Sequence, residues 1–292
     1  MTRAAVLSAV MALLAAPPAS AADALRVVTT ARAVQPGEVV LFTVSTTAPV
    51  EQLRARAFDR DLPTFRRDLE TWQAVLGIDL DTPARPYAVS FDAMLDGVVV
   101  TTTTTLVVGL KQFPTRRLQV EAAFVNPPAS TLQRITNEAT DLAELWKHSS
   151  GSRLWSDAFV RPVSSAANSS FGVRSIFNGE PRQPHGGADF PSPTGTPIQA
   201  PSGGRIVMAR DLYFTGNTVV IDHGLSVFSL LAHLSAMDVT TGDIVTMGQV
   251  IGQVGQTGRV TGPHLHWAVR IGDARVDPLS LLAMLGAAPA LP

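Results

Sequence analysis

The chain has 292 residues, of which 46% are hydrophobic and 16% are charged, with a formal net charge of −1. At roughly 150 residues per domain, this length predicts two domains with separate hydrophobic cores. The apolar content excludes a disordered chain, and no nucleic-acid partner is expected, because phosphate binding requires a basic excess. There is no cysteine, so a metal site must use histidine and carboxylate side chains.

The N-terminus has the pattern of a secretory signal peptide. Arg3 precedes an apolar run at residues 4–16, and Ala19-Ser20-Ala21 fits a signal peptidase site. We expect residues 1–21 to be removed and the mature chain to be exported, with the periplasm favoured because no wall-binding repeat or basic tail is present. The run is shorter than the ~20 residues of a membrane span, and no second one follows, so no span is expected in the mature chain. The alternative is a buried N-terminal helix.

Residues 22–114 are predicted to form an N-terminal β-sandwich, an Ig-like domain. Of the 22 glycines, only four precede residue 150, which marks a change of composition. Val39–Thr46, Tyr87–Phe91 and Val98–Val108 are rich in β-branched residues and bounded by turn-forming residues. Asp68–Leu80 fits a helix or a strand equally well.

A connector is predicted at residues 115–150, with a helix at residues 130–147. Ser130 and Gln133 fit a capping box at its start. Apolar residues then recur at helical spacing on one face, namely Leu132, Ile135, Ala139, Leu142 and Leu145. His148 is interpreted as a solvated helix end rather than a metal ligand.

Residues 151–292 are predicted to form a mostly antiparallel β domain, because short extended segments follow one another without a long helix between them. These segments are Thr196–Ala200, Arg205–Arg210, Asn217–Asp222, Leu225–Leu231, Ile244–Ile251 and Leu265–Ile271.

Histidines in this half of the chain occur in patterns that suit metal binding. His185-Gly-Gly-Ala-Asp189 places an imidazole and a carboxylate four residues apart, in a loop or at a strand start because of the two glycines. His264 and His266 flank Leu265, so on a strand both imidazoles project from one face. His233 lies at the end of an apolar strand and by itself suits a core position better than a catalytic one.

Zinc is the ion that would unite these histidines. A hydrolytic zinc site has three protein ligands and an open position for water, and two histidines with one carboxylate meet this need without thiolates. Further histidines beside the ion could accept a proton from water and stabilise an oxyanion. His223 has no partner at ligand spacing and is interpreted as structural.

The three segments His185-x-x-x-Asp189, Ala232-His233-Leu234-Ser235 and Gly262-Pro-His-Leu-His266 resemble, in this order, the signatures of the lysostaphin-type, LytM-like zinc endopeptidases. Smaller matches extend the resemblance from about residue 159 to residue 278; they include Phe171-Gly172, Asp222-His223-Gly224 and Gly255-x-Thr257-Gly258. The first half is similar to a sandwich-like module found in some members.

This resemblance implies a compact antiparallel β domain with an open groove. It implies an exported zinc metalloendopeptidase that hydrolyses peptide cross-links of bacterial peptidoglycan, most simply of the D-Ala–diaminopimelate type. His185, Asp189 and His266 would bind Zn²⁺. His233 and His264 would flank the catalytic water, one as general base and the other stabilising the tetrahedral intermediate.

Three positions depart from the family pattern, and several alternatives stay open. Leu231 replaces a frequent Tyr, Ser226 a common Gly and Ser175 a frequent basic residue, which leaves substrate preference and rate undetermined. One alternative function is a non-catalytic, LytM-like regulator of cell-wall amidases; another is a protease for glycine-rich proteins. The N-terminal domain could be a spacer, a module for a regulatory protein partner, or a cover for the groove.

Overall fold

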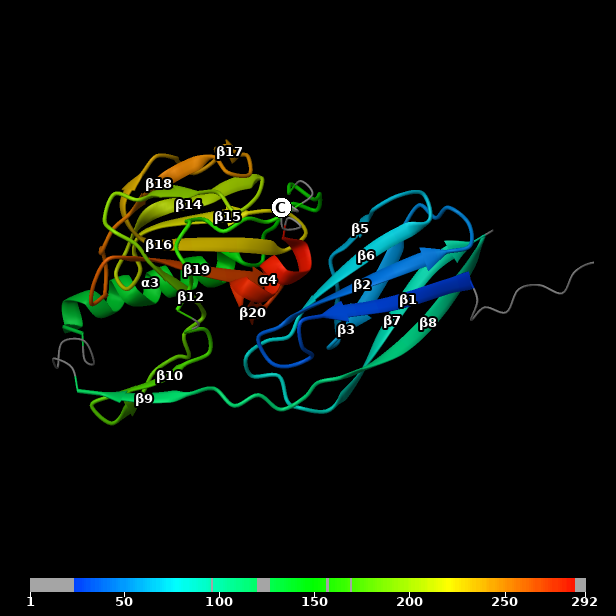
Figure 1. Ribbon diagram of the computed structural model, residues 1–292, viewed down its shortest axis with the longest axis horizontal. Coiled ribbons are helices and arrows are strands. Elements are labelled where there is room, and N and C mark those ends of the chain that lie inside the picture. Colours follow the sequence, from blue (N-terminus) through cyan, green and yellow to red (C-terminus); the bar gives the residue numbers. More distant parts are fainter. Residues whose placement is uncertain (1–23, 96, 120–126, 156–157, 169, 287–292) are drawn as a thin grey trace, which may run out of the picture.

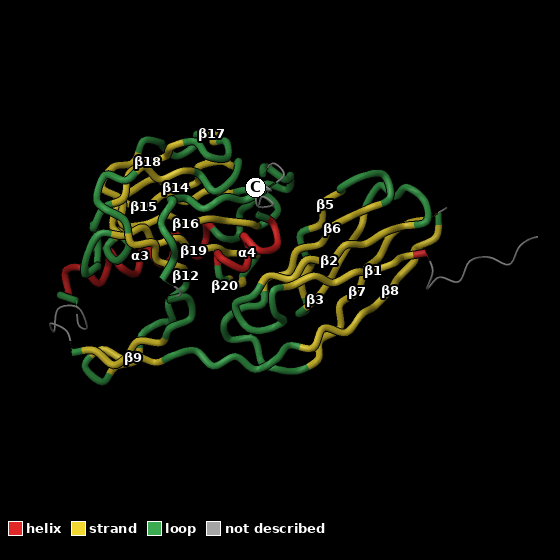
Figure 2. Tube along the Cα trace, viewed as in Figure 1, coloured by secondary structure: helices red, strands yellow, loops and turns green. Residues whose placement is uncertain are grey.

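The computed structural model is mainly β and divides into two β-rich parts (Figures 1 and 2), which confirms the expected fold class. It describes residues 24–95, 97–119, 127–155, 158–168 and 170–286, so the predicted signal peptide lies outside the described residues. None of the helices within these ranges has the length and apolarity needed to cross a membrane.

The N-terminal part is a sandwich of two four-stranded sheets with the orders β1-β2-β6-β5 and β4-β3-β7-β8. Its strands are β1 (Leu25–Ala31), β2 (Val39–Thr46), β3 (Leu53–Ala57), β4 (Arg60–Asp61), β5 (Thr64–Arg66), β6 (Thr71–Gly77), β7 (Pro86–Leu95) and β8 (Val98–Val107). The core lies between the sheets, where the rings of Phe42 and Phe91 pack edge to face with centroids 5.3 Å apart.

The ambiguous segment Asp68–Leu80 contains strand β6, which pairs with β2. Trp72, Ala74 and Leu76 enter the core of the sandwich, whereas Val75 on the other face joins the core of the C-terminal part. Both faces of the strand are therefore buried. Burial on both faces removes the alternation of apolar and polar residues that normally identifies a strand.

The connector contains strand β9 (Thr115–Leu118) and helix α3 (Ala129–Leu145). The predicted capping box is wrong: the helix begins after Pro128, Ser130 lies within its first turn, and Gln133 donates a hydrogen bond to Asn137 instead. Pro128 has extended backbone angles and immediately precedes the first helical residue, Ala129, so the helix starts one residue earlier than expected. Leu142 and Leu145 pack on a small cluster that includes Met208 and Phe228.

The C-terminal part is built on a nine-stranded antiparallel sheet with the path β12-β19-β16-β15-β14-β17, to which β13, β18 and β20 are attached. Its strands are β12 (Gly187–Pro191), β13 (Pro197–Gln199), β14 (Gly204–Leu212), β15 (Gly216–Asp222), β16 (Val227–Met237), β17 (Ile244–Val245), β18 (Val250–Val254), β19 (His264–Ile271) and β20 (Ala274–Val276). A small sheet of order β11-β10-β9 lies beside it, with β10 (Arg174–Phe177) parallel to β9 and β11 (Glu180–Pro181) antiparallel to β10.

Two features of this part differ from the expected elements. Ile244–Ile251 is not one strand, because a turn that contains Gly248 at φ 80° separates β17 from β18. Helix α4 (Pro278–Leu285) was not predicted. Its start follows a recognisable rule, since the Asp277 side chain accepts a hydrogen bond from the Leu279 N–H and proline occupies the first helical position.

The two parts pack against each other through charged and apolar contacts. Arg275, in β20, forms hydrogen bonds with both carboxylate oxygens of Asp79, at 3.0 and 2.7 Å. Arg32 bridges Glu38 and Asp277, at 2.9 and 2.6 Å. These contacts lie near the C-terminal end of β19. The boundary at which the sandwich meets the C-terminal part is therefore at this end of the strand.

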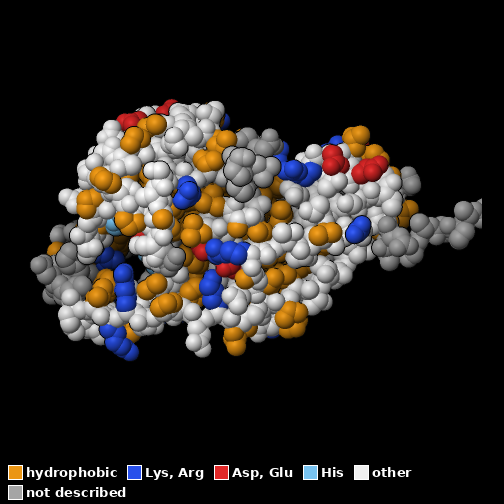
Figure 3. All heavy atoms as spheres, in the orientation of Figure 1, with side chains coloured by type: hydrophobic (Ala, Val, Ile, Leu, Met, Phe, Trp, Pro, Cys, Tyr) orange, Lys and Arg blue, Asp and Glu red, His pale blue; other side chains and the backbone are white. Residues whose placement is uncertain are grey.

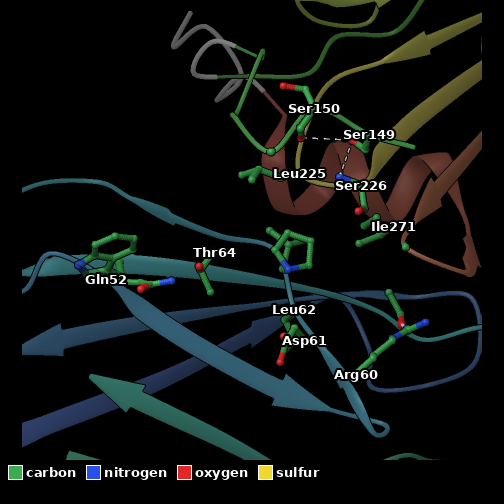
Figure 4. Close-up of a pocket in the computed structure, with 16 residues that line it drawn as sticks. Gln52, Arg60, Asp61, Leu62, Thr64, Ser149, Ser150, Leu225, Ser226 and Ile271 are labelled. Atoms are coloured by element: carbon green, nitrogen blue, oxygen red, sulfur yellow. Dashed lines mark hydrogen bonds between the residues drawn. The ribbon is translucent and has the colours of Figure 1, made fainter. Parts of the chain in front are cut away.

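Gly77 allows this close approach, because a Cβ there would lie 2.9 Å from side-chain atoms of Ala274 and Val276. A pocket lies between the sandwich and the C-terminal part, beside this contact (Figure 4). The pocket is lined from the sandwich by Arg60, Leu62 and Thr64 and from the C-terminal part by Ser149, Leu225 and Ile271.

Candidate metal centre

Strands β12 and β19 bring Asp189 and His266 directly opposite each other in antiparallel register. Residues opposite one another in such a pair project from the same face. The His266 Nδ1 atom consequently lies 2.9 Å from the Asp189 Oδ1 atom. On the same strand, Leu265 is fully buried between His264 and His266, as the alternation of the segment predicts.

His185 reaches the same oxygen from the loop that precedes β12. Its Nε2 atom lies 3.0 Å from Asp189 Oδ1, and its backbone is held by hydrogen bonds with Gly172 and Val173. Gly187, the first residue of β12, allows the strand to begin this close to β19, because a Cβ there would lie 2.4 Å from the Trp267 carbonyl oxygen. The chain can therefore pass from the His185 loop into β12 at this distance from β19 only with glycine at this position.

The donor set of His185, Asp189 and His266 fits a divalent metal ion. One ligand atom from each residue lies within 4.8 Å of the others. Ligands about 2.0–2.2 Å from a tetrahedral ion are separated by about 3.3 Å, close to the two observed separations. The Nδ1 atom of His185 is buried and has no hydrogen-bond partner among the described residues.

The protonation states also suit metal binding, which requires an ionised carboxylate and neutral imidazoles. Burial would raise the pKa of Asp189, but hydrogen bonds with His185 and His266 outweigh it and bring the pKa well below its usual range. Burial lowers the pKa of His266, although its hydrogen bond with Asp189 opposes this shift. At neutral pH the group therefore offers the required forms of Asp189 and His266.

His233 and His264 lie beside this group. The ring of His233 is 4.9 Å from that of His264 and 5.9 Å from that of His266, measured between centroids. The Nδ1 atoms of His233 and His264 lie 2.9 and 2.8 Å from the carbonyl oxygens of Thr257 and Gly262. A carbonyl only accepts hydrogen bonds, so in the neutral rings Nδ1 carries the proton and Nε2 is the basic nitrogen.

His233 owes its position to an irregularity in β16. Between Leu231 and Leu234 the register with β15 shifts, and His233 has a left-handed φ of 68°. A bulge of this kind redirects a side chain that would otherwise follow the strand alternation. Burial, and next to it the nearby His266, lowers the pKa of His233 to about 4, so its ring is neutral at pH 7.

Two residues that support the site were not singled out from the sequence. Thr257 holds the loop opposite β16: its hydroxyl donates to the Leu234 carbonyl and accepts from the Asn217 N–H, both at 2.9 Å. Ser170 donates to the second oxygen of Asp189 at 3.3 Å. Thr257 belonged to a recognised Gly-x-Thr-Gly segment, whereas Ser170 gave no signal.

The remaining histidines do not belong to the group. His223 is fully buried; its Nδ1 lies 2.7 Å from the Gly203 carbonyl oxygen and its Nε2 lies 2.9 Å from the Ser229 hydroxyl. It has the structural position expected of it. His148 lies at the exposed end of α3 beside Glu144.

The positions that depart from the family pattern have distinct surroundings. Leu231 is fully buried in the core of the sheet. Ser226 is in a turn at φ 61°, where its N–H donates to the Ser149 hydroxyl. Ser175 accepts a hydrogen bond from the Arg116 Nε of β9 at 2.9 Å. None of them is a member of the metal-binding group.

Comparisons with known proteins agree with this geometry. The model of peptidase family M23 matches residues 183–278. The chain is 49% identical over 96 residues to the peptidoglycan DD-endopeptidase ShyA of Vibrio cholerae. It is 45% identical over 97 residues to the DD-carboxypeptidase/endopeptidase Mpg of Neisseria meningitidis. Each match covers 33% of this chain and 22% of the relative, so the chain spans about a fifth of these proteins.

One solved structure is similar over both parts of the chain. It is a Pseudomonas aeruginosa protein assigned to peptidase M23, with 30% identity and a TM-score of 0.66 over 85% of this chain and 95% of that chain. The site and fold define a protein of the metallopeptidase class with a His–Asp–His group on an antiparallel sheet. The chain belongs to peptidase family M23.

Proposed function

We propose that this protein is a zinc metalloendopeptidase that hydrolyses peptide cross-links of bacterial peptidoglycan, of the D-Ala–diaminopimelate type. The observation that carries the proposal is the convergence of one ligand atom each from His185, Asp189 and His266 beside His233 and His264. The names of the relatives support the substrate, since ShyA is a peptidoglycan DD-endopeptidase and Mpg a DD-carboxypeptidase/endopeptidase.

His185, Asp189 and His266 would hold the zinc ion, because two imidazoles and a carboxylate are a ligand set of hydrolytic zinc sites that leaves one position open. Bound zinc supplies Lewis acidity, which polarises a carbonyl and lowers the pKa of a water ligand from ~15.7 to ~7. The hydrogen bond from Ser170 to Asp189 Oδ2 keeps the carboxylate oriented, so that Oδ1 faces the two imidazoles.

His233 and His264 would move the proton and bind developing charge. A neutral ring whose Nδ1–H is fixed on a carbonyl can accept a proton from the attacking water at Nε2. The protonated ring then donates it to the amide nitrogen as the C–N bond breaks. The products are a carboxylic acid and an amine, and transfer of the remaining proton of the water from the acid to the amine gives a carboxylate and an ammonium group. The second ring would stabilise the tetrahedral intermediate; since its Nδ1–H is held by a carbonyl, it can donate from Nε2 to the oxyanion only as an imidazolium.

The test is digestion of purified peptidoglycan by the zinc-loaded protein, followed by mass spectrometry of the muropeptides. We expect cross-linked dimers to decrease and monomers with a new diaminopimelate amine to appear. Chelation should stop the reaction, and added zinc should restore it. Unchanged dimers with a fully zinc-loaded protein would contradict the proposal and favour the amidase regulator, whereas cleavage restricted to glycine-rich peptides would favour the other alternative.

We also propose that the protein is exported and acts in the periplasm. The proposal is supported by the sequence of residues 1–21 and by the extracytoplasmic position of the proposed substrate. Cell fractionation with N-terminal sequencing of the purified protein tests it. A mature chain that starts at Ala22 in the periplasmic fraction is expected, and an unprocessed chain in the cytoplasm would contradict it.

A further inference from the structure

Strand β8 is an edge strand of the sandwich that lacks the usual protection against pairing. It is the last strand in the order β4-β3-β7-β8, and within the described residues it pairs with β7 alone. Natural edge strands are usually blunted by charged side chains, proline or a bulge. The ten residues of β8, VVVTTTTTLV, include neither a charged residue nor proline, and their register with β7 is continuous. The outer edge of β8 can therefore accept another strand.

Every second residue of β8 directs its backbone hydrogen-bonding groups to this outer edge. In an antiparallel pair these groups point alternately towards the neighbouring strand and away from it. Val108, which continues the register of β8, donates to the Arg85 carbonyl beside β7 at 3.1 Å, whereas Gly109 donates away from β7, to the Val34 carbonyl, at 2.8 Å. The odd-numbered residues of β8 therefore direct their N–H and C=O groups outward; these are Val99, Thr101, Thr103, Thr105 and Val107.

The side chains along this edge are uncharged and partly apolar. Val98, Val99 and Val107 are 64%, 59% and 62% exposed, and Met94, opposite Val99 on β7, is 61% exposed. In Figure 3 the lower margin of the sandwich, which β8 follows in Figure 1, shows mainly orange and white atoms. A strand added here would cover apolar surface without desolvating a charge of β8.

The sequence of β8 is complementary to itself in the antiparallel direction. Residues 97–109 read GVVVTTTTTLVVG, which is the same in both directions except that Leu106 mirrors Val100. The centre of this symmetry is Thr103, whose backbone groups point outward. Two copies related by a two-fold axis at Thr103 would therefore exchange hydrogen bonds there and set threonine opposite threonine and aliphatic residue opposite aliphatic residue, pairs that stabilise a sheet.

We propose that this protein forms a two-fold symmetric dimer in which the β8 strands of two copies pair antiparallel about Thr103. The two four-stranded sheets would become one continuous sheet, and the contact closes on itself because each copy contributes the same edge. The apolar contacts of the sandwich with the C-terminal part come from β2, β5 and β6, in the other sheet. Pairing through β8 therefore leaves the metal centre accessible, and the inference is independent of the proposed function.

The first test introduces charges at positions that the register sets opposite each other. Thr101 would face Thr105 of the second copy, so Thr101→Lys combined with Thr105→Lys opposes like charges twice. Thr101→Lys combined with Thr105→Glu is the matched control, because it opposes unlike charges at the same positions. Analytical ultracentrifugation over a dilution series measures the dissociation constant. We expect dimerisation about tenfold weaker with two lysines and at least as tight as the wild type with lysine and glutamate.

The second test locates the two-fold axis by cross-linking. The chain has no cysteine, so a single introduced thiol reports on its own distance from the second copy. Thr103→Cys would place two thiols at the axis, where Cα atoms of a hydrogen-bonded pair lie about 5.5 Å apart, within the range of a disulfide. Thr101→Cys is the control, since its two copies would be displaced by four residues, about 13 Å along the strands. Mild oxidation should give a covalent dimer of the first variant and not of the second.

A wild type that stays monomeric throughout the dilution series would overturn the inference and leave a strand of another protein as the occupant of this edge. Equal dimerisation of the two charge variants would also overturn it, because it would place the contact on another surface. Equal cross-linking of the two cysteine variants would exclude the register about Thr103. Circular dichroism of each variant shows that a loss of dimer is not a loss of fold.

Discussion

Strands β8 and β19 lie in different parts of the molecule and show the same alternation of side chains with different consequences. In β8 the alternation places threonines on an exposed face, where Thr101 donates to Asp92 of the neighbouring strand at 2.7 Å. In β19 it places His264 and His266 on one face, and the register sets His266 opposite Asp189. Alternation therefore selects the face of a strand, whereas the register with its neighbour decides whether that face can bind an ion.

The largest effect is expected from replacing a residue of the metal-binding group, because the strand register of β19 matters only if that group binds the ion. His185→Ala, Asp189→Ala and His266→Ala should each lose the metal and the activity together, because two remaining ligands hold zinc poorly. The affinity for zinc should fall by more than about 100-fold, which is the most that removal of a residue hydrogen-bonded to a metal ligand usually costs. Metal analysis by mass spectrometry and turnover of cross-linked muropeptides measure it. His148→Ala, at the exposed end of α3, is the control and should retain both; a metal-loaded Asp189→Ala protein would contradict the assignment.

A smaller effect is expected at the histidines that lie outside the ligand set. His233→Ala and His264→Ala should keep most of the zinc and lose about 10²–10⁴-fold in kcat, the range of general acid–base catalysis. The ratio of metal content to activity separates them from the ligand variants. Normal cleavage of peptidoglycan by His264→Ala would show that this ring has no part in proton transfer or oxyanion binding.

The resemblance to the three family signatures predicted the members of the metal group, and local sequence patterns predicted the backbone that bears some of them. The spacing of His264 and His266 specifies one face of a strand, and the glycines before Asp189 exclude a helix. The position of His233 depends on a bulge and on a carbonyl of the loop at Thr257, which are tertiary features. The pattern Ala-His-Leu-Ser indicated the residue but not its orientation.

The relation between the two parts could not be predicted, because it depends on surfaces that are distant in sequence. Residues of β2 and β6 bury one face in the sandwich and the other against the C-terminal part. A strand buried on both sides has no polar face, which is why Asp68–Leu80 was ambiguous. The position of the sandwich near the end of β19 that bears Ile271, opposite the end that bears His264, agrees better with a spacer than with a cover.

Gly77 provides a test of this boundary that leaves the metal centre untouched. Gly77→Ala would place a methyl group 2.9 Å from side-chain atoms of Ala274 and Val276. We expect a loss of about 1–3 kcal/mol in the free energy of unfolding, the usual cost of overpacking, measured by urea denaturation. Gly109→Ala is the matched control, since its new methyl group meets nothing nearer than 3.6 Å. An equal effect of the two substitutions would show that the contact at Gly77 is not tightly packed.

The smallest effect concerns the charged part of the same boundary and depends on pH. Burial alone would raise the pKa of Asp79 and of Glu38, but the hydrogen bonds from Arg275 and Arg32 outweigh it, so both pKa values lie below the ordinary range. A carboxyl group with a lower pKa in the folded state contributes its full stabilisation above the unfolded pKa of about 4. This contribution is lost as the pH falls through the folded value.

The free energy of unfolding should therefore decrease as the pH is lowered from about 5 towards 2. Urea denaturation at a series of pH values measures the slope. Asp79→Asn and Glu38→Gln should each make the slope shallower, since an uncharged side chain cannot lose a proton-linked contact. Removal of both should reduce it further than either alone, because the Arg275 and Arg32 contacts involve different partners. A slope unchanged in the double variant would place the acid sensitivity elsewhere in the protein, and the ion pairs would then contribute to orientation of the two parts rather than to their stability.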